Sequence, residues 1–258
     1  MPIADGIHYF LHEGERQKRN PLVLIHGAGG DHLSWPAEIR RLTDARVFTI
    51  DLPGHGKSKG PGRQSVADYA ADVIRFMNAS DLSRAVLVGH ALGGAVALAL
   101  AIDHPQRVAG IGLISSGARL PVASAVLENA CNPATFILAI QALQEMMHIP
   151  QTARHVQEQA FGRYSSIRPT LFHGDLLASD QFDVSTRLGD IHEPTLVICG
   201  TDDQLAPRRF SENLAQGIPR AALQTIDGAG HLVMLEQPRR VAGLVSIFLK
   251  GIQYLPGA

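Results

Sequence analysis

The chain has 258 residues, with 23 Lys and Arg against 24 Asp and Glu, so its formal net charge is −1. This balance argues against a protein whose main task is to bind nucleic acid or an anionic membrane. Apolar residues make up 45% and charged residues 18%, a composition that can fill a large core in one or two domains.

The sequence also argues against a membrane-spanning, secreted or metal-dependent protein. No apolar run approaches the roughly 18 residues of a transmembrane helix, and residues 1–6 lack the pattern of a signal peptide. Two cysteines, Cys131 and Cys199, are too few for a disulfide framework or a cysteine-based zinc site. None of the 12 histidines has a convincing metal-ligand spacing. We expect a cytoplasmic monomer or homodimer without metal or cofactor.

Short aliphatic runs alternate with helical patterns along the chain, which is typical of parallel βαβ units. Helices are predicted over 66–79, 92–103, 207–216 and 238–250, the first with Ser65 as its N-cap. The predicted fold class is therefore α/β, with a mostly parallel sheet flanked by helices. The runs that we predict as strands are 7–12, 22–25, 47–50, 86–88, 111–114, 196–199 and 222–226.

About 80 residues without a strong strand pattern separate the predicted strands at 111–114 and 196–199. Residues 120–159 are helix-like, with breaks at Pro121, Pro133 and Pro150. Two ordinary crossover helices would need less chain than this. We therefore predict a helical cap over 118–187, inserted after the sixth strand of a core domain formed by 1–117 and 188–258.

The strongest local signal is an apolar strand, a tight turn and an apolar helix over residues 86–95, Val-Leu-Val-Gly-His-Ala-Leu-Gly-Gly-Ala. This is the context of the G-x-S-x-G nucleophile elbow, in which the residues two before and two after the apex must be small. Gly89 and Gly93 meet that requirement, but the apex is Ala91.

Four further segments accompany the elbow. His26–Gly30 is a Gly-rich loop after a predicted strand, and Asp51–Ser58 follows the next strand. Gly200–Pro207 and Gly228–His231 lie near the C-terminus and hold an acid and a histidine. In this order the five segments resemble those of the α/β-hydrolase superfamily, in particular its small lidded ester-hydrolase branch, over nearly the whole chain.

The resemblance implies a catalytic role for several positions. His231 would be the general base, Asp203 would orient it, and position 91 would hold the nucleophilic serine. The backbone N–H groups of Ala28 and Leu92 would form the oxyanion hole. Asp202 is an alternative to Asp203, although its spacing fits less well, and His26, His55 and His90 are expected to shape loops.

Ala91 cannot act as a nucleophile, which leaves two interpretations. In the first, Ala replaces a serine in an enzyme whose other parts are complete, and the chain as written is inactive. In the second, the protein is a natural non-catalytic relative that binds a small molecule in the same pocket. An aspartate at the apex, as in halide displacement, fits the Gly-His-X-Leu-Gly-Gly setting less well.

The substrate is less defined by the sequence. The cap is apolar, which favours an ester with an apolar acyl or alkyl group. Lys57, Lys59 and Arg63 cluster in one loop, and a basic rim there would suit an acyl-coenzyme A, so thioester hydrolysis is an alternative. The residues that we predict to bind the substrate are Gly27, Trp35, His90, Phe136, Met146, Leu205 and Leu232.

Overall fold

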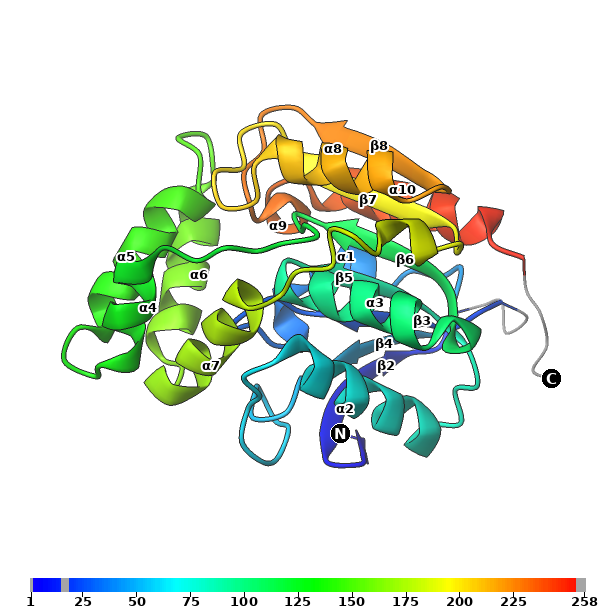
Figure 1. Ribbon diagram of the computed structural model, residues 1–258, viewed down its shortest axis with the longest axis horizontal. Coiled ribbons are helices and arrows are strands. Elements are labelled where there is room, and N and C mark those ends of the chain that lie inside the picture. The colour runs from blue at the N-terminus through cyan, green and yellow to red at the C-terminus, as the bar shows by residue number, and fades with distance from the viewer. Residues whose placement is uncertain (1, 15–18, 254–258) are drawn as a thin grey trace.

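The computed structural model describes residues 2–14 and 19–253, and an eight-stranded sheet forms its centre (Figure 1). The strand order is β1-β2-β4-β3-β5-β6-β7-β8; β1 and β2 are antiparallel to their neighbours, and the strands from β4 to β8 run parallel. The prediction of an α/β fold with a mostly parallel sheet is confirmed. The strands are β1 (Ile3–Ala4), β2 (Ile7–His12), β3 (Leu22–Ile25), β4 (Val47–Ile50), β5 (Ala85–His90), β6 (Val108–Ile114), β7 (Thr195–Gly200) and β8 (Ala221–Ile226).

The central strands have no solvent-facing side. Every residue of β3, β4, β5, β6 and β7 is buried, which explains why these segments are continuous aliphatic runs without alternation. Strand β8 lies at the edge, and there exposed and half-buried residues alternate.

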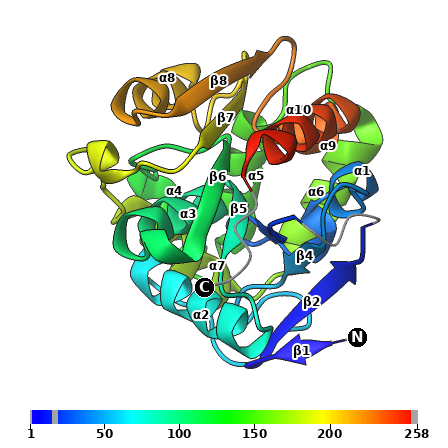
Figure 2. The ribbon, with the colours of Figure 1, turned by 90° about the vertical axis from the view of Figure 1, so that its right-hand side faces the viewer.

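Helices cover both faces of the sheet (Figure 2). On one face, α2 (Val66–Ala79), α3 (Leu92–Asp103) and α8 (Arg208–Gly217) supply apolar side chains to one core cluster. On the other, α1 (Ala37–Arg40), α9 (Val233–Glu236) and α10 (Pro238–Gly251) supply a second. Helix α3 is buried from Leu92 to Ile102, as its composition predicts. Short 3-10 helices cover His32–Ser34, Pro105–Arg107 and Leu188–Asp190.

Four helices between β6 and β7 lie together at one end of the sheet, on the left in Figure 1. They are α4 (Ser124–Cys131), α5 (Phe136–Met147), α6 (Arg154–Ser165) and α7 (Pro169–Asp180). Their buried side chains form a hydrophobic cluster of their own. An isolated antiparallel bridge joins Arg119 to Asp183, so the chain enters and leaves this helical segment at one place. The predicted domain boundaries at 118 and 187 lie beside this bridge and stay a prediction. We refer to α4, α5, α6 and α7 as the cap helices.

Several predicted bounds differ from those of the structure by a few residues at element ends. Pro207 is the N-cap of α8 rather than its first residue, whereas Pro238 opens α10 and Ser65 caps α2 through the Asp68 N–H. The sequence patterns missed β1, α1 and α9, because elements of two to four residues carry no periodicity to detect.

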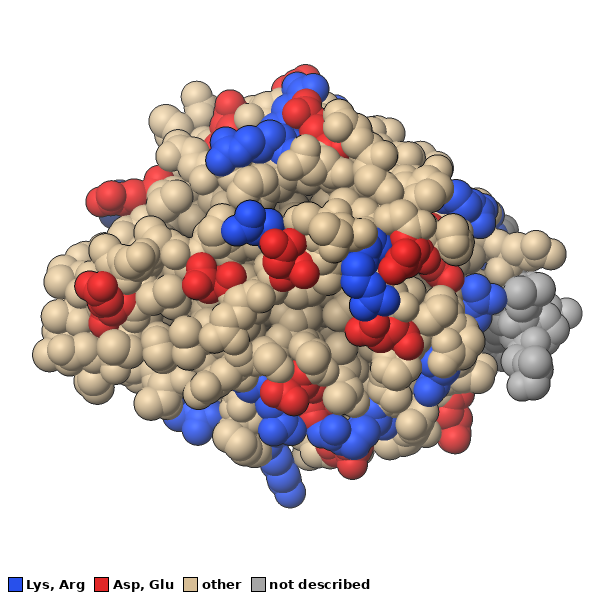
Figure 3. All heavy atoms as spheres, viewed as in Figure 1, with Lys and Arg blue, Asp and Glu red and all other residues tan. Residues whose placement is uncertain are grey.

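The surface carries charges of both signs. On the face shown in Figure 3, Lys and Arg alternate with Asp and Glu over the described part of the chain. Among the helices of the described residues, none combines the length and apolar character required to cross a bilayer.

Candidate active site

Ala91 lies between the carboxyl end of β5 and the start of α3, beside the central strand β3. Its backbone has φ 47° and ψ −111°, a left-handed conformation that a β-carbon makes costly by about 1–3 kcal/mol. The turn is held in place because the Ala91 N–H donates to the carbonyl of Ile114 at 3.0 Å and its carbonyl accepts from the Ser116 hydroxyl at 2.9 Å.

The glycines beside Ala91 are required by close backbone approach. A β-carbon on Gly89 would lie 2.1 Å from the backbone of Gly93, and one on Gly93 would lie 2.2 Å from the carbonyl oxygen of Ile25. The small residues of the predicted elbow therefore have a direct steric cause.

His231 and Asp203 form a buried pair. The ring Nδ1 of His231 lies 3.0 and 3.1 Å from the two carboxylate oxygens of Asp203, which also accepts the N–H groups of Leu205 and Ala206. Although burial alone would raise the pKa of the Asp203 carboxyl, the neighbouring His231 lowers it overall. Asp202, the alternative acid, is exposed, and its backbone N–H donates to the carbonyl of Ala229, whereas His231 pairs with Asp203.

The two residues predicted to supply the oxyanion hole, Ala28 and Leu92, both line the same cavity. Leu92 is the first residue of α3, and the first N–H groups of a helix have no partner within the helix. In the Gly-rich loop, Gly30 N–H donates to Gly27 and Gly29 N–H donates to Asp175. Within the described ranges no acceptor takes up the N–H of Ala28.

A cavity of about 90 Å³ joins these groups. Ala91, Leu92, Ala28 and His231 all line it, and none of the described residues that line it is Lys or Arg. A larger hollow of about 640 Å³ lies between residues 118–121 and α8, and neither Ala91 nor His231 lines it. The other residues that line the small cavity are Gly27, His90, Leu120, Pro121, Val122, Leu143, Met147, Tyr164, Phe172, Leu176, Ser179, Leu205 and Ala206.

The structure places four of the predicted substrate-binding residues at this site. Gly27, His90 and Leu205 line the cavity, and Leu232 lines a smaller adjoining one of about 30 Å³ that shares Gly27 and His90. Tyr164, Phe172 and Leu176 also line the site but were missed, because no local pattern shows which face of a cap helix points at the core.

Three predicted pocket residues lie elsewhere, which corrects those predictions. Trp35 is buried in the core cluster on the α10 face of the sheet. Phe136 packs inside the cap cluster against Phe172. Met146 is 37% exposed, and its neighbour Met147 lines the cavity instead, since successive helix residues point about 100° apart.

Two other histidines act through hydrogen bonds. His26 accepts the Leu52 N–H on Nε2, and His90 contacts the carbonyl of His231 through Nε2 at 3.0 Å. Burial, with the neighbouring His55, lowers the pKa of His26 to about 4, and burial, with the neighbouring His231, lowers that of His90 to about 3. Both rings are therefore neutral near pH 7.

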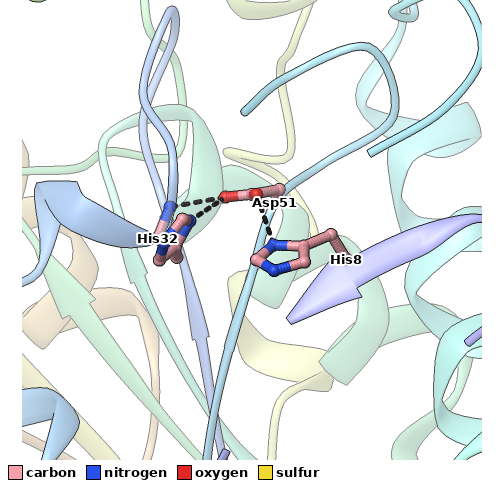
Figure 4. A group of neighbouring side chains, drawn as sticks. All are labelled: His8, His32 and Asp51. Atoms are coloured by element: carbon pink, nitrogen blue, oxygen red, sulfur yellow. Dashed lines mark hydrogen bonds and ion pairs between the residues drawn. The ribbon is translucent and has the colours of Figure 1, made fainter. Parts of the chain in front are cut away.

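Two further histidines surround Asp51, which directly follows β4 (Figure 4). His8 and His32 point at the carboxylate of Asp51, with Nδ1–oxygen distances of 2.7 and 2.8 Å. These three side chains could also hold a cation. However, the carboxylate also accepts the backbone N–H groups of His32 and Lys57, so hydrogen bonds alone account for its burial. We interpret the group as a junction between loops.

An ion pair with helix α2 balances part of the positive charge in the loop that carries Lys57, Lys59 and Arg63. Arg63 forms a two-pronged ion pair with Asp72 of α2, at 2.7 and 3.0 Å. Lys57 and Lys59 are exposed, and neither belongs to the lining of the cavity.

Acid is expected to destabilise the fold through His26 and His90. An unfolded histidine binds its proton near pH 6.5, whereas these two bind theirs only near pH 4 and 3, so unfolding takes up protons below pH 6.5. Their contribution is fully present above pH 6.5 and is lost as the pH falls toward 4. We expect the free energy of unfolding to drop by about 2–3 kcal/mol per pH unit between pH 6 and 5.

Urea unfolding midpoints at pH 7, 6 and 5 measure this slope. The variant His26→Gln keeps an acceptor for the Leu52 N–H but cannot titrate, so its slope should be about half as steep. A midpoint that does not change between pH 7 and 5 would contradict the assignment of neutral buried rings.

Comparisons with known proteins agree with this geometry. Residues 20–238 match the family model described as alpha/beta hydrolase fold. The chain is 33% identical to "Putative carbamate hydrolase RutD" of Variovorax paradoxus (strain S110), over 87% of this chain and 89% of that protein. It is 31% identical to "2-hydroxymuconate semialdehyde hydrolase" of Pseudomonas putida, over 96% and 92%.

A solved structure is similar over nearly the same length. A thermophilic esterase from Thermogutta terrifontis superposes with a TM-score of 0.84 at 28% identity, covering 95% of this chain and 93% of that one. The family match spans most of the chain, including the elbow, the Gly-rich loop, Asp203 and His231. The chain therefore belongs to the alpha/beta hydrolase fold family.

Proposed function

We propose that this protein is built as a serine hydrolase of carboxylic esters, and that Ala91 makes the present chain inactive. One observation carries the proposal: Ala91, His231, Ala28 and Leu92 line a single cavity, and most of the other residues that line it are apolar. A nucleophile position, a base and two N–H donors are what acyl transfer requires.

In the Ala91→Ser form the reaction has two steps. Asp203 engages Nδ1 of His231, so Nε2 remains to take the proton of the serine hydroxyl as its oxygen attacks the acyl carbon. The N–H groups of Ala28 and Leu92 stabilise the oxyanion. The C–O bond of the ester then breaks and the alcohol leaves with the proton from His231. Water, deprotonated by His231, releases the acid and restores the serine.

The conformation of Ala91 supports replacement of a serine over natural loss of function. A lineage without catalysis would relieve the strain at φ 47° by a change to Gly or Asn, whereas Ala keeps the β-carbon and removes only the hydroxyl. The remaining partners of the site are all present. A natural small-molecule-binding relative is the competing interpretation, and activity of Ala91→Ser separates the two.

The apolar lining supports an ester over an acyl-coenzyme A. Among the described residues that line the cavity there is no Lys or Arg to attract a pyrophosphate, and Arg63 of the basic loop is engaged by Asp72. The relatives' names include a carbamate hydrolase and a semialdehyde hydrolase, so the bond that is cleaved needs a direct test.

That test compares substrates with one acyl group in the Ala91→Ser form. We expect kcat/KM for p-nitrophenyl butyrate to exceed that for butyryl-coenzyme A by at least about tenfold, because the pocket adds no binding energy for the nucleotide part. A p-nitrophenyl carbamate serves as a third arm. Equal or higher values for the thioester would favour thioester hydrolysis, and activity on the carbamate alone would overturn the ester proposal.

A further inference from the structure

Asp175 is a fully buried carboxylate on helix α7, outside the set of groups that the reaction above uses. One of its oxygens accepts the N–H of Gly29 and lies against Nε2 of His55, both at 2.8 Å, and the other accepts the hydroxyl of Tyr69. Its partners come from three separate core segments: the Gly-rich loop, the loop after β4, and helix α2.

His55 carries the charge that balances this carboxylate. Its Nδ1 lies 3.1 Å from the carbonyl oxygen of Pro53 and its Nε2 lies 2.8 Å from Asp175. Since neither oxygen can donate a hydrogen bond, both ring nitrogens need a proton and the ring is an imidazolium. Although burial opposes a charge, Asp175 raises the pKa of His55 above its ordinary value. A buried ion pair therefore joins the cap to the core.

The position of Gly29 links this pair to the cavity. Gly29 follows Ala28, one of the two proposed oxyanion donors, and it has φ +66°. The helix that carries Asp175 also places Phe172, one turn earlier, and Leu176, the next residue, in the cavity lining. A β-carbon on Gly29 would lie 2.8 Å from Phe172, so the loop and α7 are also packed tightly against each other.

We propose that Asp175 is a positioning residue for the oxyanion hole: from the cap, it holds the Gly29 N–H and thereby fixes the direction of the Ala28 N–H. The proposal rests on the proposed function. An N–H donor stabilises the oxyanion only when it is held at hydrogen-bond distance from where that charge develops, and a displaced donor lowers kcat more than it weakens substrate binding.

The first test needs no activity and uses the parent chain with Ala91. Amide hydrogen exchange is followed in the peptide that covers residues 26–34, in the parent and in Asp175→Asn. We expect exchange at least about tenfold faster in the variant, because the loop loses a charged acceptor. Glu158→Gln is the matched control, since it removes an exposed carboxylate of helix α6 that pairs with Arg154. Unchanged exchange in Asp175→Asn would overturn the proposal.

The second test uses Ala91→Ser as the background. Asp175→Asn should lower kcat for p-nitrophenyl butyrate about 10–100-fold with KM changed less than about threefold. A trifluoromethyl ketone forms an oxyanion with the serine, so its Ki should rise in Asp175→Asn by about the same factor by which kcat falls. Tyr69→Phe, which removes one donor to Asp175, should have a smaller effect in the same direction.

The outcomes separate the two proposals. If Ala91→Ser itself has no activity, the proposed function fails, while the exchange experiment still decides whether Asp175 holds the loop. If Ala91→Ser is active and Asp175→Asn matches it in kcat and Ki, the positioning role is wrong and the proposed function stands. If Asp175→Asn does not fold, both tests are made with Tyr69→Phe instead. The proposal is then overturned if Tyr69→Phe changes neither the exchange rate nor kcat.

Discussion

Ala91→Ser is expected to raise the rate of p-nitrophenyl butyrate hydrolysis by on the order of 10⁴- to 10⁶-fold over the parent chain. His231 lines the same cavity as Ala91 and pairs with Asp203, so under the proposed function only the nucleophilic oxygen is missing. Serine has the β-carbon that alanine has, so the substitution adds no new backbone strain at φ 47°. Initial rates and the mass of the trapped acyl-enzyme measure the effect.

The controls remove one partner at a time from the Ala91→Ser form. Adding His231→Ala should return the rate nearly to that of the parent, and adding Asp203→Asn should cost on the order of 10⁴-fold. Ala91→Gly should stay inactive, because it relieves the strain without supplying a nucleophile. If Ala91→Ser binds esters but turns none over, the natural binding protein is the better interpretation.

Gly93→Ala is expected to destabilise the fold by more than about 3 kcal/mol. The added carbon would lie 2.2 Å from the carbonyl oxygen of Ile25 and 2.6 Å from that of His26. Both atoms belong to the backbone at the end of the buried strand β3, which cannot move without breaking its pairing with β4 and β5. We expect a loss of soluble protein or a fall in Tm of at least about 6 °C, measured by circular dichroism.

Gly243→Ala is the matched control for that substitution. Gly243 lies in the interior of α10, it is exposed, and a β-carbon there would meet no atom within 4 Å. Alanine has the higher helix propensity, so this variant should be more stable than the parent by about 0.5–1 kcal/mol. Equal effects at the two positions would show that steric contact at the elbow is not the reason for Gly93.

Local patterns were sufficient for most elements of the core, although not for the short β1, α1 and α9. The aliphatic runs at 22–25 and 47–50 coincide with β3 and β4, and the helix predicted at 66–79 coincides with α2. The two strands are buried on both faces and the helix has Ser65 as its N-cap, so each segment has a recognisable local sequence pattern. The cap stays a prediction, but two of the predicted helix breaks, Pro133 and Pro150, lie between α4 and α5 and between α5 and α6.

The residues of the proposed site were also identifiable from the sequence, because tight turns and catalytic groups need particular residue types at fixed spacings. The walls of the cavity were not. Met147 rather than Met146 lines the cavity. Trp35 packs in the core cluster on the α10 face of the sheet, and Phe136 packs in the cluster formed by helices α4 to α7. Which face of a cap helix meets the core depends on packing between segments far apart in the chain, and no short pattern records that packing.

The sequence by itself determined the fold class, most of the core elements and the place of Ala91 at the apex of the predicted elbow. Only the tertiary structure decided which side chains surround that residue, and that Asp175 of the cap reaches the Gly-rich loop 146 positions earlier in the chain. The physical reason is that turn geometry and periodicity are local properties, whereas a buried carboxylate finds its donors through the packing of the whole chain.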